Sequence, residues 1–368
     1  EVFVGLRPLV KAIPRMGDLP SAVVIVPAHD EEAIIEATIE RLTSAAAGYA
    51  RVLVVADNCT DQTAQIARAA GAEVIERSDA ARRGKGFALD FARRHLGANP
   101  PELVLIIDAD CAIDGKSIEC LVRSCAATGR PCQATNLQQA ASDASPAVQL
   151  STFAFFIKNV IRQRALQRLA GKVHLLGTGM AFPWPIFVSA DLATSNIVED
   201  LKLGQELAIS GHAPVLIEQA EVWSRAETDA NTISQRRRWE GGFLQNAVRV
   251  APRIFGKALI SGSSRLLWGA IDLMIPPFAL LILLDFVLLL AGAAFVWLGL
   301  SQSWPLYWLC TALLLAMVAL ALAWILGGSR FVSLRSLVRA PLYVAWKLPM
   351  YVGLARRGAP SEWLRTER

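Results

Sequence analysis

The sequence predicts an α/β domain with a doubly wound, mostly parallel sheet, followed by transmembrane helices. Three observations support this prediction. In the first part of the chain, short apolar runs alternate four times with helical stretches. Of the 368 residues, 54% are hydrophobic and only 19% are charged, which is unusual for a soluble protein. The apolar excess is concentrated between Leu273 and Gly327, where Asp285 is the only charged residue.

Four apolar runs are the predicted strands, at residues 22–27, 52–55, 72–75 and 103–107. Continuous runs rich in β-branched residues suit strands that are buried on both faces of a parallel sheet. Helical stretches follow three of these runs, at about 31–47, 61–71 and 86–95. Asp30 stands directly before the first helical stretch and is expected to be its N-cap.

The composition argues against several classes of protein. The net charge of +5 is modest, and no basic run is interleaved with aromatic residues, so no nucleic-acid partner is expected. The basic residues instead fringe the apolar segments, where they suit contact with anionic lipid headgroups. The sequence has neither the GxGxxG turn of a dinucleotide-binding domain nor a P-loop. The six cysteines form no CxxC pair, which favours reduced thiols in a cytosolic domain.

Acidic residues follow three of the predicted strands. The first strand runs into Glu31, the second into Asp57, and the fourth into Asp108 and Asp110. Ligands of such sheets bind beyond the carboxyl ends of the strands. Each acid alone also suits a helix cap, but three acidic strand ends in one domain favour a site. Carboxylates at positions 108 and 110 can reach one Mg²⁺ or Mn²⁺ ion, whose remaining ligands would be diphosphate oxygens.

Two further motifs stand later in the chain. Glu199 and Asp200 form an acidic pair at the start of a predicted helix. Gln235, Arg238 and Trp239 bring together an amide, a guanidinium group and an indole. By itself the acidic pair suits a capped helix start, and the arginine cluster suits a basic patch beside a membrane. Their order and spacing relative to the upstream acids favour a shared site.

The whole set of motifs resembles the D, DxD, ED and QxxRW signature of the family 2 glycosyltransferases, through Asp57, Asp108-Ala109-Asp110, Glu199-Asp200 and Gln235-Arg236-Arg237-Arg238-Trp239. Within that family the chain is similar to the membrane-bound branch that contains cellulose, chitin and hyaluronan synthases. Residues 26–32 resemble the family's opening strand and loop, with Asp30 where Asn is usual. The resemblance covers about residues 21–250. Ceramide glucosyltransferases share much of the signature, so the resemblance indicates the donor better than the acceptor.

The resemblance implies a GT-A fold and a set of donor-side roles. Asp57 is expected to hold the nucleobase or ribose, with Ala28 to Glu31 forming part of the same wall. Asp108 would contact the nucleotide sugar and, together with Asp110, the metal. The resemblance further implies that Gln235 and Arg238 contact the diphosphate, and that Lys85 either contacts it or supports the acidic site.

The acceptor-side roles follow from the same resemblance. Asp200 is expected to be the general base that takes a proton from the acceptor hydroxyl, which predicts single displacement with inversion. Trp239 offers a flat apolar face on which an acceptor sugar can stack. The other residues implied on the acceptor side are Gly177, Thr178, Gly179 and Glu199. An ordinary turn is the alternative for the glycine-containing loop.

Two apolar stretches, 273–300 and 304–326, are each long enough to cross the hydrocarbon core of a bilayer. Because basic residues crowd both outer flanks, a hairpin with both ends in the cytoplasm is expected, in the inner or plasma membrane. Asp285, inside the first stretch, would line an acceptor path, pair with a neighbouring helix or be protonated. The amphipathic stretch 252–268 suits either the membrane interface or a soluble connection.

The expected organisation is therefore a juxtamembrane segment (1–20), a GT-A domain (21–250), an amphipathic interfacial segment (251–272), a transmembrane hairpin (273–326) and a basic tail (327–368). The chain begins at Glu1 rather than Met, so an upstream membrane helix is left open. The expected reaction is metal-dependent transfer of a hexose or hexosamine, from a UDP-sugar, to a saccharide or lipid-linked acceptor in envelope or extracellular polysaccharide synthesis. Two alternatives are a one-step glycolipid synthase and a noncatalytic nucleotide-sugar-binding protein. With only two spans, export of a polymer would need a homo-oligomer or a partner.

Overall fold

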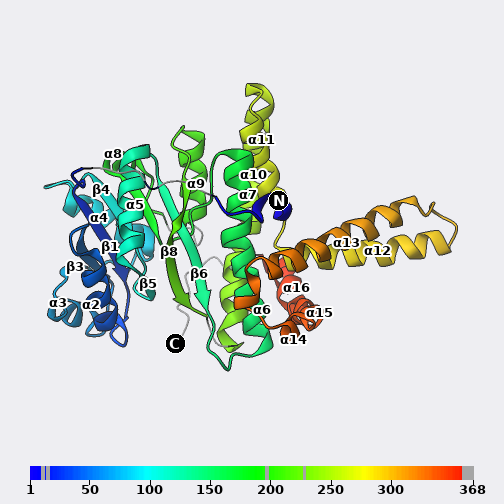
Figure 1. The fold of residues 1–368 in the computed structure, drawn as a ribbon, viewed down its shortest axis with the longest axis horizontal. Helices are drawn as coiled ribbons and strands as arrows, with labels where there is room; N and C mark the ends of the chain where they lie inside the picture. Colours follow the sequence, from blue (N-terminus) through cyan, green and yellow to red (C-terminus); the bar gives the residue numbers. More distant parts are fainter. Residues whose placement is uncertain (10–12, 14–16, 195–198, 227–228, 359–368) are drawn as a thin grey trace.

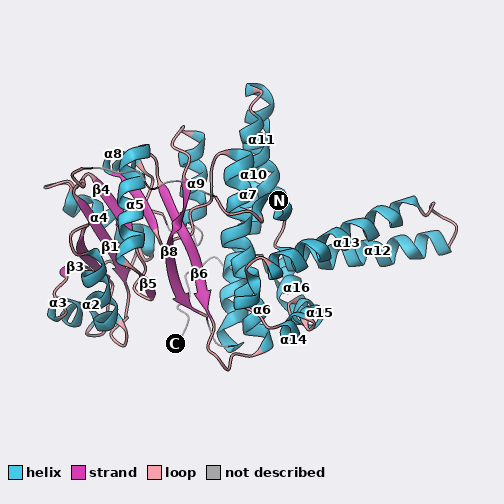
Figure 2. Cartoon of the chain, in the orientation of Figure 1, coloured by secondary structure: helices cyan, strands magenta, loops and turns pink. Residues whose placement is uncertain are grey.

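One eight-stranded sheet forms the core of the chain, with helices on both faces and a long helical pair projecting from one end (Figures 1 and 2). In this computed structural model, residues 1–9, 13, 17–194, 199–226 and 229–358 are described, apart from the side chains of 229–235. The strands are β1 (Ala22–Ala28), β2 (Arg51–Asp57), β3 (Glu73–Arg77), β4 (Leu103–Ile106), β5 (Cys111–Ile113), β6 (Cys132–Gln139), β7 (Met180–Pro183) and β8 (Val215–Arg225).

The sheet is mixed, in the order β3-β2-β1-β4-β7-β6-β8-β5. The four strands expected from the sequence form its parallel half, β3-β2-β1-β4. Beyond β4 the expectation of a mostly parallel sheet is wrong. Strand β7 is antiparallel to both β4 and β6, β8 is parallel to β6, and β5 is antiparallel to β8. The carboxyl ends of β1, β2 and β4 still meet at one edge, as the parallel half requires.

Strand β1 shows why continuous apolar runs occupy the centre of the sheet. Val24 and Val26 pack into the hydrophobic core on one face, whereas Val23 and Ile25 pack into the core on the other. All four are at most 1% exposed. The first core is covered by α2 (Ile35–Ala46), α3 (Thr63–Ala69) and α5 (Gly115–Thr128), and the second by α4 (Lys85–Leu96), α8 (Trp184–Ser189) and α9 (Glu199–Ile209).

The expected N-cap at Asp30 is wrong. Helix α2 begins at Ile35, after an N-cap position occupied by Ile34. Asp30 has a left-handed backbone conformation with φ of 52°, and its Oδ1 accepts a hydrogen bond of 2.6 Å from the backbone N–H of Thr60. A tertiary contact between the loops after β1 and β2 therefore uses the side chain that was expected to cap the helix.

A second helical layer packs beside the end of the sheet that carries β6 and β8 (Figure 1). Residues 146–170 form one continuous helical segment that contains a π-helical turn. Helix α10 continues through Pro252 as one long helix, so the expected boundary at residue 250 falls inside it. The elements of this layer are α1 (Val2–Gly5), α6 (Pro146–Phe156), the π-helix η1 (Ile157–Ile161), α7 (Arg162–Ala170), α10 (Asp229–Ser261) and α11 (Ser264–Met274).

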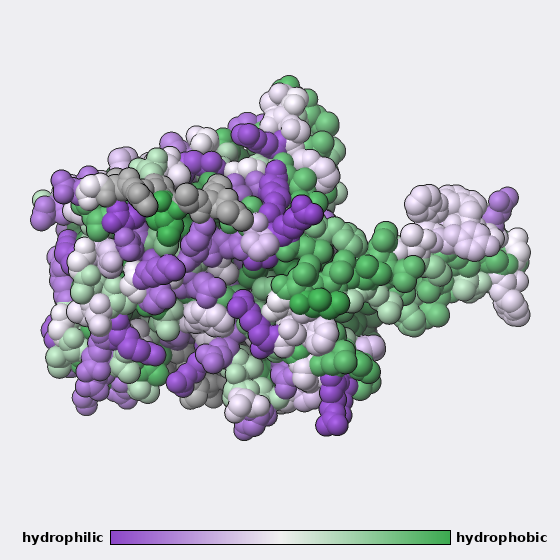
Figure 3. Space-filling model, in the orientation of Figure 1, coloured by the Kyte–Doolittle hydropathy of each residue, from purple (hydrophilic) through white to green (hydrophobic). Residues whose placement is uncertain are grey.

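Helices α12 (Phe278–Trp297) and α13 (Trp304–Ile325) form the projecting pair. Both are long and apolar enough to cross a membrane. In their most apolar 18-residue stretches, only 6% and 11% is buried within the chain. Figure 3 shows apolar side chains gathered on the pair where it leaves the body, with a paler tip. Exposed aromatic residues lie toward that tip, namely Trp297, Trp304, Tyr307 and Trp308.

The chain after the helical pair is divided into short helices that pack back on the second helical layer. These are η2 (Gly328–Arg330), α14 (Leu334–Leu337), α15 (Ala340–Trp346) and α16 (Leu348–Arg357). Their anchor is Glu240 of α10, which accepts a hydrogen bond of 2.5 Å from Nζ of Lys347 and one of 2.7 Å from the Tyr351 hydroxyl. Lys347 is only 3% exposed, so this contact satisfies a buried charge.

We predict that Glu240→Gln destabilises the folded chain by about 3–5 kcal/mol, because it leaves the ammonium group of Lys347 buried without an anion. Thermal unfolding of the protein in lipid measures the change. Glu36→Gln, an exposed change on α2, is the matched control and should stay within about 0.5 kcal/mol of the parent. Equal stability of the two variants would show that Glu240 does not anchor the C-terminal helices.

Candidate active site

A cavity of about 540 Å³ lies where β1, β2 and β4 end. This is the edge at which parallel α/β sheets bind ligands. The structure brings most of the residues expected from the sequence into its wall, namely Ala28, Glu31, Asp57, Lys85, Asp108, Asp110, Gly177, Thr178, Glu199, Asp200, Arg238 and Trp239. Gly179 does not line the cavity, and the side chain of Gln235 lies outside the described residues.

Asp108 and Asp110 follow β4 directly. One carboxylate oxygen from each, together with Sγ of Cys111, lies within 4.8 Å of the others, a separation that suits a bound cation. Burial raises the pKa of the Cys111 thiol well above its usual value of 9.0, so the thiol keeps its proton at neutral pH. The remaining carboxylate oxygens are the hard ligands that Mg²⁺ and Mn²⁺ prefer. The donor set therefore fits such an ion better than a soft metal.

Lys85 is the cation within this group of acids. It begins α4, directly after Gly84, whose φ of 124° favours glycine. Its ammonium group forms an ion pair with Asp108 and donates a hydrogen bond of 2.8 Å to the carbonyl oxygen of Gly177. Burial lowers the pKa of Lys85, but Asp108 and Glu199 outweigh that effect and raise the pKa above its usual value. Lys85 is therefore charged at neutral pH.

Gly177 and Thr178, in the loop Gly177–Gly179, line the cavity next to Lys85. The hydroxyl of Thr178 accepts a hydrogen bond of 3.1 Å from the backbone N–H of Asp108. The buried Gln133 side chain donates to the carbonyl oxygen of Thr178 at 2.8 Å and so fixes the loop. A Cβ atom on Gly179 would lie 2.8 Å from Val222, so this glycine packs against the sheet. The expected contribution of Gly179 to acceptor binding is thus not supported by its position.

Glu199 and Asp200 begin α9, as the sequence predicts, and face the same space. A Cβ atom on Gly177 would lie 3.4 Å from Oδ2 of Asp200 and 3.7 Å from Nζ of Lys85, which places the acid and the lysine close together. Burial, followed by the charge of Asp200, raises the pKa of Glu199 to about 8. Burial also raises the pKa of Asp200. A carboxylate with a raised pKa is a stronger base at neutral pH.

Asp57 lies at the other end of the cavity and is 6% exposed. Its Oδ1 accepts a hydrogen bond of 2.6 Å from Nη1 of Arg77. Its backbone carbonyl oxygen lies 2.7 Å from Nδ1 of His29. The carboxylate is thus held in a fixed orientation at the cavity wall.

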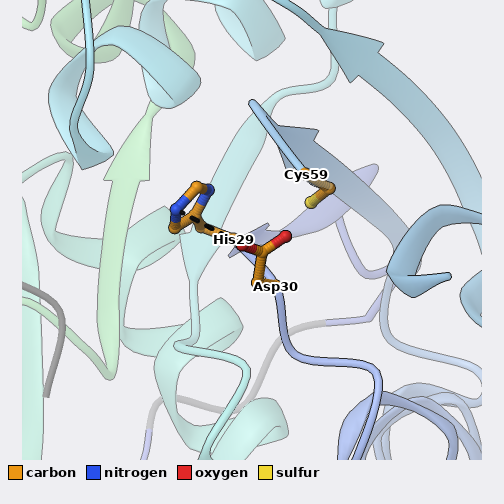
Figure 4. Close-up of side chains that lie close together, drawn as sticks. All are labelled: His29, Asp30 and Cys59. Atoms are coloured by element: carbon orange, nitrogen blue, oxygen red, sulfur yellow. Dashed lines mark ion pairs between the residues drawn. The ribbon is translucent and has the colours of Figure 1, made fainter. Parts of the chain in front are cut away.

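Figure 4 shows His29, Asp30 and Cys59 close together on the loops that follow β1 and β2. One atom of each lies within 4.8 Å of the others, and His29 Nε2 is 3.8 Å from Oδ2 of Asp30. Asp30 is already bonded to Thr60, and burial raises the pKa of the Cys59 thiol above 9.0. These contacts suit a link between two loops better than a second metal site, because the thiol stays protonated.

Helix α10 contributes Arg238 and Trp239 to the wall on the side of the second helical layer. The ring of Trp239 packs against Phe155 with 5.7 Å between ring centroids. The guanidinium carbon of Arg236 lies 5.5 Å from the Trp239 ring, and Nζ of Lys158 lies 5.8 Å from it. The indole is therefore a fixed part of the wall.

Several cavity residues were not expected from the sequence. They come mostly from β6, η1 and the loop after α7, and include Asn136, Gln138, Lys158, Asn159, Arg162 and His174. One signal was available in the sequence. Residues 153–161 are apolar except for adjacent Lys158 and Asn159, and polar residues within an apolar helix indicate a cavity or a partner. Nothing comparable in the sequence indicated that β6 would contribute to the cavity.

The order of the sheet and the acids at its edge define an α/β domain with a site for an anionic ligand and a divalent metal. A family model described as glycosyltransferase-like family 2 matches residues 20–242, which is more than half of the chain. The chain therefore belongs to this family and is a glycosyltransferase. No match is found among the curated proteins.

Solved structures of glycosyltransferases are similar to this chain. The mannosyltransferase PcManGT from Pyrobaculum calidifontis, in complex with GDP-Man and Mn²⁺, is 19% identical. The similarity covers 94% of this chain and 92% of that chain, with a TM-score of 0.54, and shows that the fold is shared. Glucosyl-3-phosphoglycerate synthase from Mycobacterium tuberculosis, in complex with Mn²⁺, UDP-glucose and phosphoglyceric acid, is 20% identical over 61% of this chain and 79% of that chain, with a TM-score of 0.41.

We predict that Glu199→Gln flattens the pH dependence of stability. Because folding raises the pKa of Glu199 from 4.5 to about 8, the folded state holds a proton that the unfolded chain releases in this range. The stabilisation from this carboxyl group is complete at low pH and is lost as the pH rises toward 8.

Thermal unfolding between pH 5 and 8, in the presence of EDTA, measures the effect. The unfolding free energy of the parent chain should fall as the pH rises in this range, with a slope that corresponds to the release of about one proton on unfolding. Glu199→Gln should remove this slope. Glu206→Gln, an exposed change on the same helix, should leave the slope unchanged. An identical slope in Glu199→Gln and the parent would show that Glu199 is ionised in the folded chain.

Proposed function

We propose that this glycosyltransferase is membrane-bound and metal-dependent, and that it transfers a hexose or hexosamine, with inversion, from a nucleotide-diphosphate sugar to an acceptor hydroxyl. The observation that carries the proposal is the placement of Asp108 and Asp110 in the same cavity as Asp200, with Lys85 and Gly177 between them. A metal and diphosphate site and a general base are thus available to one bound donor. PcManGT, which shares the fold, binds GDP-Man and Mn²⁺, and this supports the same donor chemistry.

The donor would lie along the edge of the sheet. Asp57, held by Arg77, would bind the nucleobase or ribose beside Ala28 and Glu31. A divalent cation bound by Asp108 and Asp110 would neutralise the charge that develops on the departing diphosphate. Lys85 and Arg238 would contact the diphosphate through charge-assisted hydrogen bonds, and Gln235 is proposed to do the same.

Asp200 would accept the proton of the acceptor hydroxyl as its oxygen attacks the anomeric carbon. The bond from that carbon to the diphosphate oxygen breaks, and the nucleoside diphosphate leaves with the bonding electron pair. One displacement inverts the configuration. The acceptor is proposed to contact Gly177, Thr178, Glu199 and the face of Trp239. A carboxylate base of this kind contributes about 10²–10⁴-fold to the rate.

Membrane attachment is proposed through α12 and α13. Their length and composition suit two spans, and aromatic residues near the tip of the pair suit the membrane–water interface. The basic flanks favour a catalytic domain in the cytoplasm, with the spans in the inner or plasma membrane. Such a protein would serve the synthesis of an extracellular or envelope polysaccharide, and a homo-oligomer or an export partner would complete a path for a polymer. This proposal keeps the division of the chain expected from the sequence, into segments 1–20, 21–250, 251–272, 273–326 and 327–368.

Turnover of the purified chain in lipid, with a panel of UDP-sugars and GDP-mannose and with or without Mg²⁺ or Mn²⁺, tests the proposal. Metal-dependent release of one nucleoside diphosphate is expected, with a UDP-sugar as the preferred donor. Product analysis separates a polymerase, which gives a ladder of lengths, from a one-step glycolipid synthase, which gives one product. Binding of nucleotide without turnover on any acceptor would favour a noncatalytic role instead.

We predict that Asp200→Asn lowers the turnover number by about 10²–10⁴-fold while donor and metal binding stay unchanged, because the amide retains the shape of the side chain but cannot accept the proton. Steady-state release of nucleoside diphosphate and equilibrium binding of the nucleotide give the two quantities. Asp191→Asn, an exposed change outside the 540 Å³ cavity, is the control. Near-normal turnover of Asp200→Asn would remove Asp200 from the role of base.

We predict that Asp110→Ala raises the Mn²⁺ concentration needed for half-maximal activity by about tenfold or more, since one of two carboxylate ligands is lost. Titration of activity and of nucleotide binding with Mn²⁺ measures the change. Asp114→Ala removes a nearby carboxylate that caps α5 and should leave the metal requirement unchanged. If both variants require the same Mn²⁺ concentration as the parent, then Asp110 is not a ligand.

A further inference from the structure

Lys158 is a partly buried lysine that forms no ion pair within the described part of the chain. It stands in the π-helix η1, a distortion that is often found at functional sites, and it lines the 540 Å³ cavity. Among the described residues it forms no hydrogen bond or ion pair. Its ammonium nitrogen lies 5.8 Å from the centroid of the Trp239 ring. Burial, followed by the charge of Arg236, lowers the pKa of Lys158 to about 8.

The charges of the nearby acids, Asp200 and Glu240, do not outweigh the effects of burial and of Arg236 on the pKa of Lys158. Arg236 is 4% exposed, and its guanidinium group donates to the hydroxyl and carbonyl oxygens of Ser151, both of which are uncharged. Glu240 is the nearby acid on α10, but it is already bonded to Lys347 and Tyr351. One buried and one partly buried cation thus lie beside the Trp239 ring, and a desolvated charge without a partner is costly. An anionic ligand would remove that cost.

The two lysines of the cavity have different surroundings. Lys85 is paired with Asp108, on the side of the metal and the diphosphate. The charges that most affect the pKa of Lys158 are those of Arg236 and Asp200, and those that most affect Lys85 are Asp108 and Glu199. Lys158 lies against the ring of Trp239, which is proposed to face the acceptor, so an anion beside Lys158 would belong to the acceptor.

We propose that Lys158, with the aromatic rings of Phe155 and Trp239, forms an anion subsite for the acceptor, and hence that the acceptor carries a carboxylate or phosphate group. This assignment rests on the proposed function, because it uses Trp239 as a residue of the acceptor side. A lysine ammonium is a compact point charge, so it attracts carboxylate and phosphate oxygens alike. The rings of Phe155 and Trp239 provide an apolar face beside that charge, on which a sugar ring can stack.

Four probes that differ only in charge and chain length test the subsite. Methyl β-glucuronide and methyl β-glucoside differ by one carboxylate, and octyl β-glucuronide and octyl β-glucoside repeat that difference on an amphiphile. Equilibrium binding of each probe to the full chain in phosphatidylcholine nanodiscs gives a ratio of affinities, and binding of UDP is measured in parallel. A preference in the methyl pair indicates a soluble anionic acceptor, and a preference confined to the octyl pair indicates a lipid-borne one.

The parent chain is expected to bind the charged member of a pair about tenfold more tightly or better. Lys158→Met should bring that ratio close to one without changing the affinity for UDP. Lys158→Arg, which retains the charge, should keep most of the preference and also shows that the position tolerates a folded variant. Lys172→Met is the matched control, since Lys172 is a buried lysine bonded to Gln205 and does not line the 540 Å³ cavity.

A ratio near one in the parent chain, or a preference that survives Lys158→Met, would overturn the anion subsite. Loss of UDP affinity equal to the loss of glucuronide affinity would also overturn it, because Lys158 would then serve the donor diphosphate. Binding needs no turnover, so the two proposals can fail separately. A Lys158-dependent preference in a chain that transfers no sugar would leave the anion subsite standing and remove the proposed reaction.

Discussion

The ion pair between Lys85 and Asp108 connects the walls of the cavity. Four carboxylates, those of Asp108, Asp110, Glu199 and Asp200, converge there from two elements that are distant in sequence. Their mutual repulsion would open the site if the ammonium group of Lys85 did not lie among them. The same ammonium group bonds to the carbonyl oxygen of Gly177, so the start of α4, the end of β4 and the loop Gly177–Gly179 are fixed together. Proton uptake by Glu199 relieves the repulsion that remains.

Different kinds of secondary structure form the two sides of the cavity. The donor side consists of strand ends, where the buried parallel half of the sheet fixes the backbone and short loops carry the acids. The opposite side consists of the helical segment from α6 to α7 and of α10, and the same helices hold the C-terminal segments through Glu240. The sheet thus presents the groups that are proposed to bind the donor. The helices that also carry the apolar pair present the groups that are proposed to face the acceptor, so in this proposal acceptor binding and membrane attachment share one support.

The parallel half of the fold could be predicted because its strands are continuous apolar runs, as in β1. Strand β6 could not, since its buried positions include Gln133, Thr135 and Asn136, and a strand whose buried side chains are polar has no hydrophobic pattern. The N-cap at Asp30 failed because a tertiary hydrogen bond to Thr60 took precedence over local capping. The acids of the cavity were accessible as motifs, whereas Lys158 had only the weaker signal of a polar pair within an apolar run, and its place in the cavity depends on how the helices pack.

The π-helical turn at Ile157–Ile161 shows how a small change of length can set the composition of a site. One additional residue in a helix rotates everything after it by about 100°, because each residue of an α-helix advances by that angle. Downstream of the turn, Arg162 bonds to Asp272 of α11, and Gln163 accepts from the backbone N–H of His174. Loss of one residue from this segment would rotate both side chains, together with the buried apolar positions of α7, away from their present partners. Insertions and deletions here would therefore change the wall formed by η1 and α7 in a single step and leave the strand ends untouched.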